Sequence, residues 1–379
     1  MKYVDEFRDR QLAEGLAKAI RHEANTRRSY NVMEFCGGHT HGIFRYGVQD
    51  LMPKNVSYVH GPGCPVCVLP IGRIDHALEL AEQHGVTLCS YGDMLRVPAS
   101  KRRSLLKAKA DGADIRMVYS IDDALKIARQ NPSREVVFFA IGFETTTPPT
   151  AVAIRKAQAE GLKNFSVFCN HVLTPAALKA ILGNAEESGS VSIDAFLGPS
   201  HVSSVIGSKP YEYFADKYKR PVVIAGFEPL DVMQATLMAI RQLNEGRHVV
   251  ENQYVRVVTR HGNVKAQTLV AEVLELRSSF EWRGLGEVPS SALRIREAYA
   301  DFDAEKRFGV TTKPSRDAKS CECPSILRGE KKPTDCKLFG AVCTPDNPIG
   351  SCMVSSEGAC AAYWTYGRFR QPSSPLEAA

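Results

Sequence analysis

Short apolar runs alternate with segments of helical periodicity between residues 31 and 231, and this alternation restricts the possible folds more than any other feature. The runs have lengths that suit buried strands. In chain order they are NVMEF, VSYVH, VTLCS, IRMVY, EVVFFAI, FSVF, IDAFL and PVVIA. Helices are predicted at 71–85, at 120–132 with a Ser120 cap, and at 147–161. Such alternation predicts parallel sheets with helices on both faces.

The pattern predicts two parallel-sheet, Rossmann-like α/β lobes rather than one eight-stranded sheet. AIGFETTTP at 140–148 resembles AGFEPLD at 225–231, and each closes an apolar run. We expect lobe I at 1–125, lobe II at 126–250 and an irregular Cys-rich C-terminal domain at 251–379. Ligands of open parallel sheets bind outside the carboxyl ends of the strands. The motifs at these ends should therefore meet in one cleft between the lobes.

Composition excludes several classes of protein. The chain has 379 residues, of which 44% are hydrophobic and 24% charged, as in ordinary globular proteins. No apolar stretch approaches the ~20 residues of a membrane span, and the N-terminus lacks the apolar core of a signal peptide. The net charge of +6 does not by itself indicate nucleic-acid binding. We expect a cytoplasmic protein without a membrane or nucleic-acid partner.

Cysteine is distributed unevenly: six of the 11 cysteines fall within 40 residues, where an even distribution would place about one. These six are Cys321, Cys323, Cys336, Cys343, Cys352 and Cys360. In a cytosolic chain such clustering favours metal binding or redox chemistry over structural disulfides. The spacing matches neither zinc ribbons nor bacterial ferredoxins. Four thiolates suffice for a 4Fe-4S cluster and leave two for a redox disulfide, while a four-thiolate structural zinc site is the alternative.

The segment CGGHTHG at residues 36–42 follows a predicted strand. Its glycines allow the backbone to turn and to approach a ligand closely. The thiolate of Cys36 and the imidazoles of His39 and His41 suit a transition metal, whereas a tight turn with an incidental thiol is the alternative. Because these ligands are too few for a closed zinc site, we expect an open or shared metal site.

The segment GPGCPVC at residues 61–67 contains a C-x-x-C pair, Cys64 and Cys67, directly before a predicted helix. A helix N-terminus lowers the pKa of a nearby thiol and increases the thiolate population. No second C-x-x-C pair accompanies this one, so the arrangement predicts a redox dithiol rather than half of a zinc site. Two buried thiols in a turn stiffened by proline are the alternative.

The segment GFETTT at residues 142–147 lies between a predicted strand and a helix N-terminus, where backbone N–H groups favour anions. Glu144 is a candidate general acid or base or a cleft-lining hydrogen-bond partner, and Thr145 lies beside it. An ordinary helix cap is the alternative, because Thr and Glu are good capping residues. His201 is a further candidate, on the basis of its position at a strand end only.

Taken together, these motifs resemble the HypD family of NiFe-hydrogenase maturation factors across nearly the whole chain. They occur in the same order as in that family. They are CGGHTH at 36–41, GPGCPVC at 61–67, GFETT at 142–146, PSHVS at 199–203, GFEPLD at 226–231, and the block from CEC to SCMVSSEGACAAYW at 321–364.

The resemblance implies an assembly scaffold with redox activity. Members of the family act with a small HypC-type chaperone in building the Fe(CN)2CO part of the hydrogenase active site. A HypE-type protein with its HypF-type partner supplies cyanide. The implied fold is two α/β lobes that flank a cleft, plus a domain that holds a 4Fe-4S cluster.

The resemblance also assigns roles to individual residues. Cys36 would bind the iron and share it with the N-terminal cysteine of the chaperone, with His39 nearby. Cys64 and Cys67 would form a redox pair. The cluster ligands would be Cys321, Cys336, Cys343 and Cys360, and Cys323 and Cys352 would form the spare disulfide.

The three thiol sets suggest a relay in which electrons pass from the cluster to the spare disulfide, then to the C-x-x-C pair and the iron, by thiol–disulfide exchange. Exchange requires the sulfur atoms to meet, so the C-terminal domain would dock against the cleft. Two rival functions are a free-standing 4Fe-4S thiol–disulfide oxidoreductase, for which Cys36 would be dispensable, and a zinc-stabilised binding module without redox function, which would be colourless.

Overall fold

Two parallel sheets form the cores of two lobes. The computed structural model describes residues 5–188, 192–310 and 320–368. The first sheet has the strand order β2-β1-β7-β8-β9 and the second β4-β3-β5-β6. The strands are β1 (Tyr30–Glu34), β2 (Val56–His60), β3 (Thr87–Ser90), β4 (Ile115–Met117), β5 (Val136–Gly142), β6 (Phe165–His171), β7 (Ala195–Gly198), β8 (Val222–Ile224) and β9 (Val250–Asn252). All eight predicted strands are confirmed, and all pairings in these sheets are parallel, as expected.

The strands enter the sheets out of chain order. We call the lobe around the first sheet the split lobe, because β1 and β2 lie within residues 30–60 and β7 to β9 within 195–252. The lobe around the second sheet is the middle lobe, residues 87–171. The predicted lobes 1–125 and 126–250 therefore have wrong boundaries, since β3 pairs with β5 and β1 pairs with β7. Periodicity is a local signal, whereas strand order depends on contacts between distant segments.

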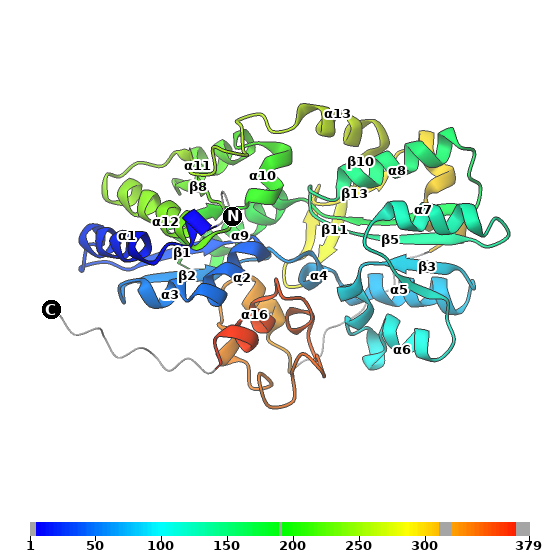
Figure 1. The fold of residues 1–379 in the computed structure, drawn as a ribbon, viewed down its shortest axis with the longest axis horizontal. Coiled ribbons are helices and arrows are strands. Elements are labelled where there is room, and N and C mark those ends of the chain that lie inside the picture. Colours follow the sequence, from blue (N-terminus) through cyan, green and yellow to red (C-terminus); the bar gives the residue numbers. More distant parts are fainter. Residues whose placement is uncertain (1–4, 189–191, 311–319, 369–379) are drawn as a thin grey trace.

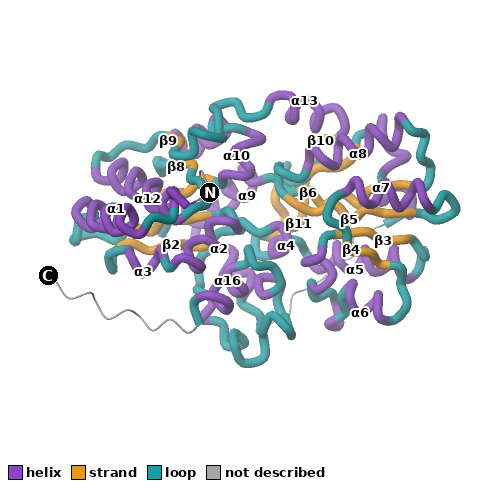
Figure 2. The backbone as a smooth tube through the Cα atoms, viewed as in Figure 1, coloured by secondary structure: helices purple, strands orange, loops and turns teal. Residues whose placement is uncertain are grey.

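Helices cover both sheets, as the alternation predicts (Figure 1 and Figure 2). The helices of the split lobe are α1 (Arg10–Glu23), α2 (Gly37–Tyr46), α3 (Val48–Leu51), α9 (Thr174–Ser188), α10 (Ser200–Ile206), α11 (Glu212–Tyr218) and α12 (Pro229–Asn244). Those of the middle lobe are α5 (Ile71–Glu82), α6 (Leu105–Ala110), α7 (Ile121–Gln130) and α8 (Thr147–Ala159). The three predicted helices are confirmed as α5, α7 and α8, and Ser120 forms a capping box at the start of α7.

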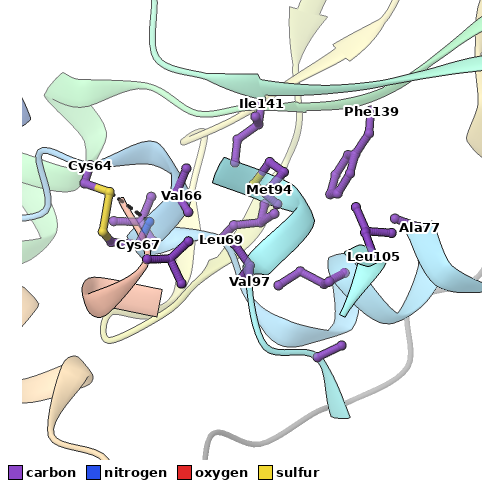
Figure 3. Close-up of a cluster of buried hydrophobic side chains, with 14 of the residues drawn as sticks. Cys64, Val66, Cys67, Leu69, Ala77, Met94, Val97, Leu105, Phe139 and Ile141 are labelled. Carbon is purple, nitrogen blue, oxygen red and sulfur yellow. Dashed lines mark hydrogen bonds between the residues drawn. A yellow bond between two sulfur atoms is a disulfide. The ribbon is translucent and has the colours of Figure 1, made fainter. Parts of the chain in front are cut away.

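The complete burial of β5 and β6 explains why their sequences are continuous apolar runs. Every residue of both strands is buried, because helices or other packed segments cover both faces of a parallel sheet of this kind. One of the two apolar clusters beside the middle sheet also contains Cys64 and Cys67, at the short helix α4 (Pro65–Val68) (Figure 3). The C-x-x-C pair thus belongs to the core that joins the middle lobe to its neighbours.

The C-terminal part consists of small elements. They are α13 (Val264–Val273), β10 (Leu274–Leu276), β11 (Ser279–Trp282), β12 (Gly286–Pro289), β13 (Leu293–Ile295), α14 (Ala304–Phe308), α15 (Cys323–Leu327) and α16 (Ala359–Tyr366). We call residues 320–368 the Cys-rich segment. It lies below the junction of the lobes in Figure 1, where α16 packs against α2. Residues 311–319 and 369–379 of the predicted C-terminal domain lie outside the described residues. Within the described ranges, none of the helices has the length and apolar character needed to cross a membrane.

Candidate functional site

A cleft between the two lobes collects the carboxyl ends of several strands. It has a volume of about 510 Å³. Of the predicted site residues, Cys36, Thr145 and His201 line it, after β1, β5 and β7 respectively. The Cys-rich segment completes the wall with Ser355, Ser356 and Glu357. The expected convergence in one cleft between the lobes is thus observed for four of the strand-end motifs, whereas GFEPLD at 226–231 contributes no lining residue.

Cys36 lies at the junction of β1 and α2, where it is the N-cap residue of the helix. Its thiol is free and 6% exposed. Burial raises the pKa of Cys36 to about 12, and the carboxylates of Glu357 and Glu34 contribute, whereas the N–H groups of Gly38 and His39 oppose the shift. The site therefore keeps this thiol protonated until a cation or another positive group offsets the nearby negative charge.

The backbone of the C-x-x-C motif packs directly against Cys36. The N–H of Gly37 donates to the carbonyl oxygen of Gly63 at 3.1 Å. A Cβ at residue 63 would overlap the backbone of Phe35 and Cys36, so only glycine permits this approach. Pro65 and Val66 line the same cleft as Cys36. The structure thus brings together two motifs that are separated by 18 residues in the sequence.

Cys64 and Cys67 form a disulfide. Cys64 is the N-cap residue of α4, and both cysteines are buried, with exposures of 3% and 0%. Figure 3 shows the disulfide at the edge of the apolar cluster, beside Val66 and Leu69. The predicted dithiol pair is therefore close enough to form its disulfide and is shielded from bulk solvent.

The Cys-rich segment contacts this disulfide. Ser351 Oγ donates to the carbonyl oxygen of Cys67 at 2.9 Å, and Cys67 Sγ lies 3.9 Å from the carbonyl oxygen of Ser351. A Cβ at Gly358 would lie 3.0 Å from Cys67 Sγ and would overlap the carbonyl of Cys352. The segment therefore docks at the C-x-x-C pair, with Cys352 next to it.

The other cysteines of this segment surround a small enclosed cavity. It is lined by Cys321, Cys323, Cys336, Cys343 and Cys360, together with Ile326, Leu338, Phe339 and Met353. Cys352 is not part of this lining, and its thiol is hydrogen-bonded to that of Cys323. This arrangement is compatible with the predicted separation into four ligands and one spare pair.

The donor set fits a polynuclear cluster. Gly350 leaves room for the sulfur atoms, because a Cβ there would lie 2.5 Å from Cys321 Sγ and closer to Cys323 Sγ. The N–H of Ile349 donates to Cys343 Sγ at 3.4 Å, a type of contact that tunes iron–sulfur clusters. In the described parts of the chain, no three His, Cys, Asp or Glu side chains converge as on a single metal ion. The four thiolates of a 4Fe-4S cluster bind separate irons and need no such convergence.

Glu34 was not recognised in the sequence. It is fully buried on β1, and its carboxylate accepts from the N–H of Cys36 at 3.1 Å, from His60 Nδ1 at 2.6 Å and from the hydroxyl of Thr40. These contacts fix the strand-to-helix junction at which Cys36 sits. The sequence signal for Glu34 is weak: an acidic residue at the end of a mainly apolar strand.

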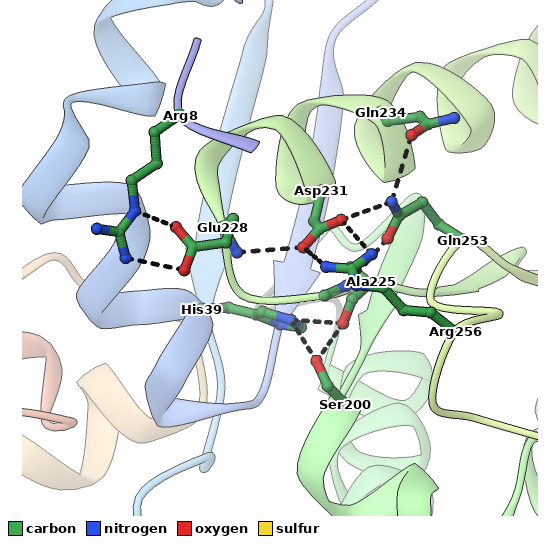
Figure 4. Close-up of polar contacts among 10 residues, drawn as sticks. Arg8, His39, Ser200, Ala225, Glu228, Asp231, Gln234, Gln253 and Arg256 are labelled. Atoms are coloured by element: carbon green, nitrogen blue, oxygen red, sulfur yellow. Dashed lines mark hydrogen bonds and ion pairs between the residues drawn. The ribbon is translucent and has the colours of Figure 1, made fainter. Parts of the chain in front are cut away.

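His39 lies behind Cys36 and does not line the cleft. It is fully buried, and its Nε2 lies 3.0 Å from the carbonyl oxygen of Ala225 and 3.3 Å from Ser200 Oγ (Figure 4). Burial lowers the pKa of His39. A neutral imidazole in this position joins α2 to the ends of β7 and β8, so it supports the site from outside the cleft.

The glutamates of the two GFE motifs have different partners. Glu228 is the N-cap residue of α12, and its carboxylate accepts a hydrogen bond from the guanidinium of Arg8 (Figure 4). Glu144 accepts from Thr174 N at 2.9 Å and from Thr174 Oγ1 at 3.0 Å, at the start of α9. Glu144 lines a separate pocket beside α13, away from the cleft. Burial raises the pKa of Glu144 to about 7.

Thr145 belongs to the middle lobe and His201 to the split lobe, and both line the cleft. Thr145 and Thr146 bring the N-terminus of α8 to the cleft wall. The ring of His201 packs on Phe227, with centroids 4.0 Å apart. Partial burial lowers the pKa of His201, so a neutral imidazole faces the cleft at neutral pH.

Comparison with known proteins identifies the family. The HypD family model, described as "Hydrogenase formation hypA family", matches residues 11–367. The chain belongs to the HypD family. It is 64% identical to the hydrogenase maturation factor HypD of Rhizobium leguminosarum bv. viciae, over 100% of this chain and 99% of the relative. It is 65% identical to HypD of Azotobacter vinelandii over 98% of each chain, and 47% identical to HypD of Escherichia coli (strain K12) over 97% and 98%. The resemblance seen in the motifs is confirmed.

Proposed function

We propose that this HypD-family chain is a cytoplasmic hydrogenase maturation factor that acts with a small HypC-type chaperone. Together they would form the scaffold on which the Fe(CN)2CO unit of NiFe hydrogenase is assembled. A HypE-type protein with its HypF-type partner would supply cyanide. Family membership supports the general role, since the relatives are named as hydrogenase maturation factors. The single observation that carries the specific role is the position of Cys36, a free thiol on an open cleft, beside the C-x-x-C motif with its Cys64–Cys67 disulfide.

Cys36 would anchor the iron, which is the cargo of the scaffold. Iron that carries cyanide and CO is soft and low-spin, and a thiolate is a suitable ligand for it. The N–H groups of Gly38 and His39 at the start of α2 stabilise the thiolate. One protein ligand on an open cleft leaves room for the N-terminal cysteine of the chaperone. An anchor shared between two proteins also allows the finished unit to leave.

Cys321, Cys336, Cys343 and Cys360 would hold a 4Fe-4S cluster. A bound cluster supplies electrons one at a time. These four residues line the enclosed cavity, which supports their assignment. Cys323 also lines it but differs from them in its hydrogen bond to Cys352. Cys323 and Cys352 would be the pair that stores two electrons as thiols and releases them on forming a disulfide.

The Cys323/Cys352 pair would reduce the Cys64–Cys67 disulfide by thiol–disulfide exchange. The thiolate of Cys323 or Cys352 attacks the Cys64–Cys67 disulfide and forms a mixed disulfide with it. The other thiol of the Cys323/Cys352 pair then resolves the mixed disulfide. Two electrons pass from the Cys323/Cys352 pair, which becomes a disulfide, to the Cys64/Cys67 pair, which becomes a dithiol beside Cys36. The docking of Ser351 and Gly358 against Cys67 supports this route, because Ser351 directly precedes Cys352 in the chain and Gly358 lies against the carbonyl of Cys352.

A free-standing thiol–disulfide oxidoreductase fits the geometry less well. Its redox pair has to reach a disulfide on another protein, whereas Cys64 and Cys67 are 3% and 0% exposed. A zinc-stabilised binding module would need no redox pair at all. Anaerobically purified protein that is colourless and contains zinc instead of iron would favour that alternative.

Infrared spectroscopy of the complex with the chaperone tests the proposal. When the chain is expressed anaerobically with its partners, the purified complex should show stretching bands of iron-bound cyanide and CO. Cys36→Ala should abolish these bands and hydrogenase maturation. Cys89→Ala, which removes a buried thiol on β3 of the middle lobe, is the matched control and should retain both. Full bands and full maturation in Cys36→Ala would contradict the proposal.

A further inference from the structure

Glu357 belongs to the Cys-rich segment, yet its side chain lies against the first residue of α2. A Cβ at Gly37 would lie 2.7 Å from Glu357 Oε2 and 2.8 Å from its carboxyl carbon. Glycine at this position therefore leaves the space that the carboxylate occupies. Glu357 and Cys36 both line the cleft. A carboxylate from one end of the chain and a thiol from the other thus border the same space.

The cleft has acidic side chains, and His201 is the one basic side chain in its lining. Among its lining residues, Asp93 and Glu357 carry carboxylates, and none is Lys or Arg. Arg96 approaches Asp93 at 3.5 Å from outside the lining. No hydrogen bond joins the carboxylate of Glu357 to another described residue, and burial together with the charges of Asp93 and Glu34 raises its pKa. Negative charge concentrated around a buried free thiol favours a cation in the cleft.

We propose that Glu357 is the second ligand that this chain provides to the ferrous ion entering the cleft, and that it binds the ion together with Cys36 before cyanide and CO are attached. This inference rests on the proposed role of Cys36 as the iron anchor. It assigns the Cys-rich segment a direct part in iron binding, in addition to its redox part.

The chemistry of the two donors explains why both are needed. A bare ferrous ion accepts carboxylate oxygens as well as thiolates, whereas iron with cyanide and CO prefers soft ligands. Glu357 would hold the incoming ion and leave when the diatomic ligands occupy its position, while Cys36 stays bound. The exchange is a ligand substitution, so the oxidation state of the iron does not change. Two donors from this chain, rather than a closed set, leave positions open for the chaperone cysteine and for the incoming ligands.

Cobalt(II) is a suitable probe for this site because a thiolate bound to it gives a charge-transfer absorption band. The anaerobic, cluster-loaded, full-length protein is titrated with Co²⁺, and the difference spectrum is recorded. Cys36→Ala should abolish the band. Glu357→Gln, which preserves the size of the side chain, should retain the band at saturation but weaken Co²⁺ binding by about tenfold or more. Glu357→Asp should bind with intermediate affinity.

The matched control is Asp93→Asn, which removes the other carboxylate of the same cleft. It should change the affinity by less than about threefold, because it lowers only the general negative charge. Equal affinity of Glu357→Gln and the unaltered protein would overturn the inference, and so would an equal loss in Asp93→Asn. In both cases loss of the band in Cys36→Ala would leave the proposed function intact. A band that survives in Cys36→Ala would contradict the proposed function itself. The iron content and melting temperature of each variant verify its folding.

Discussion

Glu144 is buried beside α9, with its carboxylate accepting two hydrogen bonds from Thr174. Desolvation outweighs these bonds and raises the pKa of Glu144 from 4.5 to about 7. A carboxyl group that is harder to ionise in the folded state reduces stability once the pH favours ionisation. Glu144 therefore makes the stability of the protein depend on pH near neutrality.

The pH dependence has a definite sign. Below pH 4.5 the carboxyl group is protonated in both states, and above pH 7 it is ionised in both. Between these values the unfolded chain releases a proton that the folded chain retains, so stability falls as the pH rises, by about 3 kcal/mol in total. Glu144→Gln should remove this fall. Relative to the unaltered protein, the variant should therefore gain about 2–3 kcal/mol in free energy of unfolding between pH 5 and pH 8.

Denaturant unfolding at the two pH values measures this difference. Glu14→Gln is the control, because Glu14 is 58% exposed and its partner among the described residues is Arg10, on the surface of α1. The control should follow the unaltered protein at both pH values. A Glu144→Gln variant that differs from the unaltered protein by the same amount at pH 5 and pH 8 would show that Glu144 does not titrate in this range.

At the scale of residues, the sequence indicates which residues carry reactive groups more clearly than it indicates where their side chains point. Cys36 was identified from its motif, because a thiol between glycines after a strand is distinctive. His39 and Glu144 were also identified, but periodicity does not tell which way a side chain points after a turn. His39 faces Ala225 and Glu144 faces Thr174, away from the cleft. Glu357 was missed because its partner, Gly37, is 320 positions away in the sequence.

At the scale of elements, local patterns predicted the strands and helices well. β5 and β6 are long and apolar, and α7 has a capping box, so each carries its own signal. The Cys-rich segment has no such periodicity. Its short helices, such as α15 and α16, are held by packing around the cysteine-lined cavity and against α2. With the proposed cluster bound, a segment of this kind would depend on its metal more than on propensity.

Gly350 tests this dependence on the metal. A Cβ at this position would overlap the sulfur atoms of Cys321 and Cys323. Gly350→Ala should therefore displace a cluster ligand and lower the iron content of the anaerobically purified protein severalfold, with a parallel loss of cluster absorption. Iron analysis and the absorption spectrum measure the effect. Gly15→Ala on α1, where a Cβ would contact nothing, is the control and should retain full iron. Full iron in Gly350→Ala would contradict the assignment of this cavity to the cluster.

At the scale of the whole molecule, the chain order of the motifs differs from their arrangement in space. β1 pairs with β7, and the Cys-rich segment returns to the cleft formed by the first strands. The sequence predicts that the motifs of Cys36 and of the C-x-x-C pair meet, because both lie at strand ends. It predicts docking of the C-terminal domain for a different reason, because thiol–disulfide exchange requires sulfur atoms to meet. It did not predict the split lobe, because strand order depends on which distant segments pack together. The result is a single site to which residues 36, 64–67 and 351–358 contribute.

Thiol trapping tests the central claim, that sulfur atoms from separate parts of the chain form one electron path to the iron-binding cleft. The anaerobic, cluster-loaded protein is reduced with dithionite, alkylated under denaturing conditions and analysed by mass spectrometry. We predict that Cys64 and Cys67 become alkylated in the unaltered protein but remain a disulfide in Cys352→Ser. The control Cys169→Ser, which removes a buried thiol on β6, should behave like the unaltered protein. Equal reduction of Cys64 and Cys67 with and without Cys352 would contradict the account.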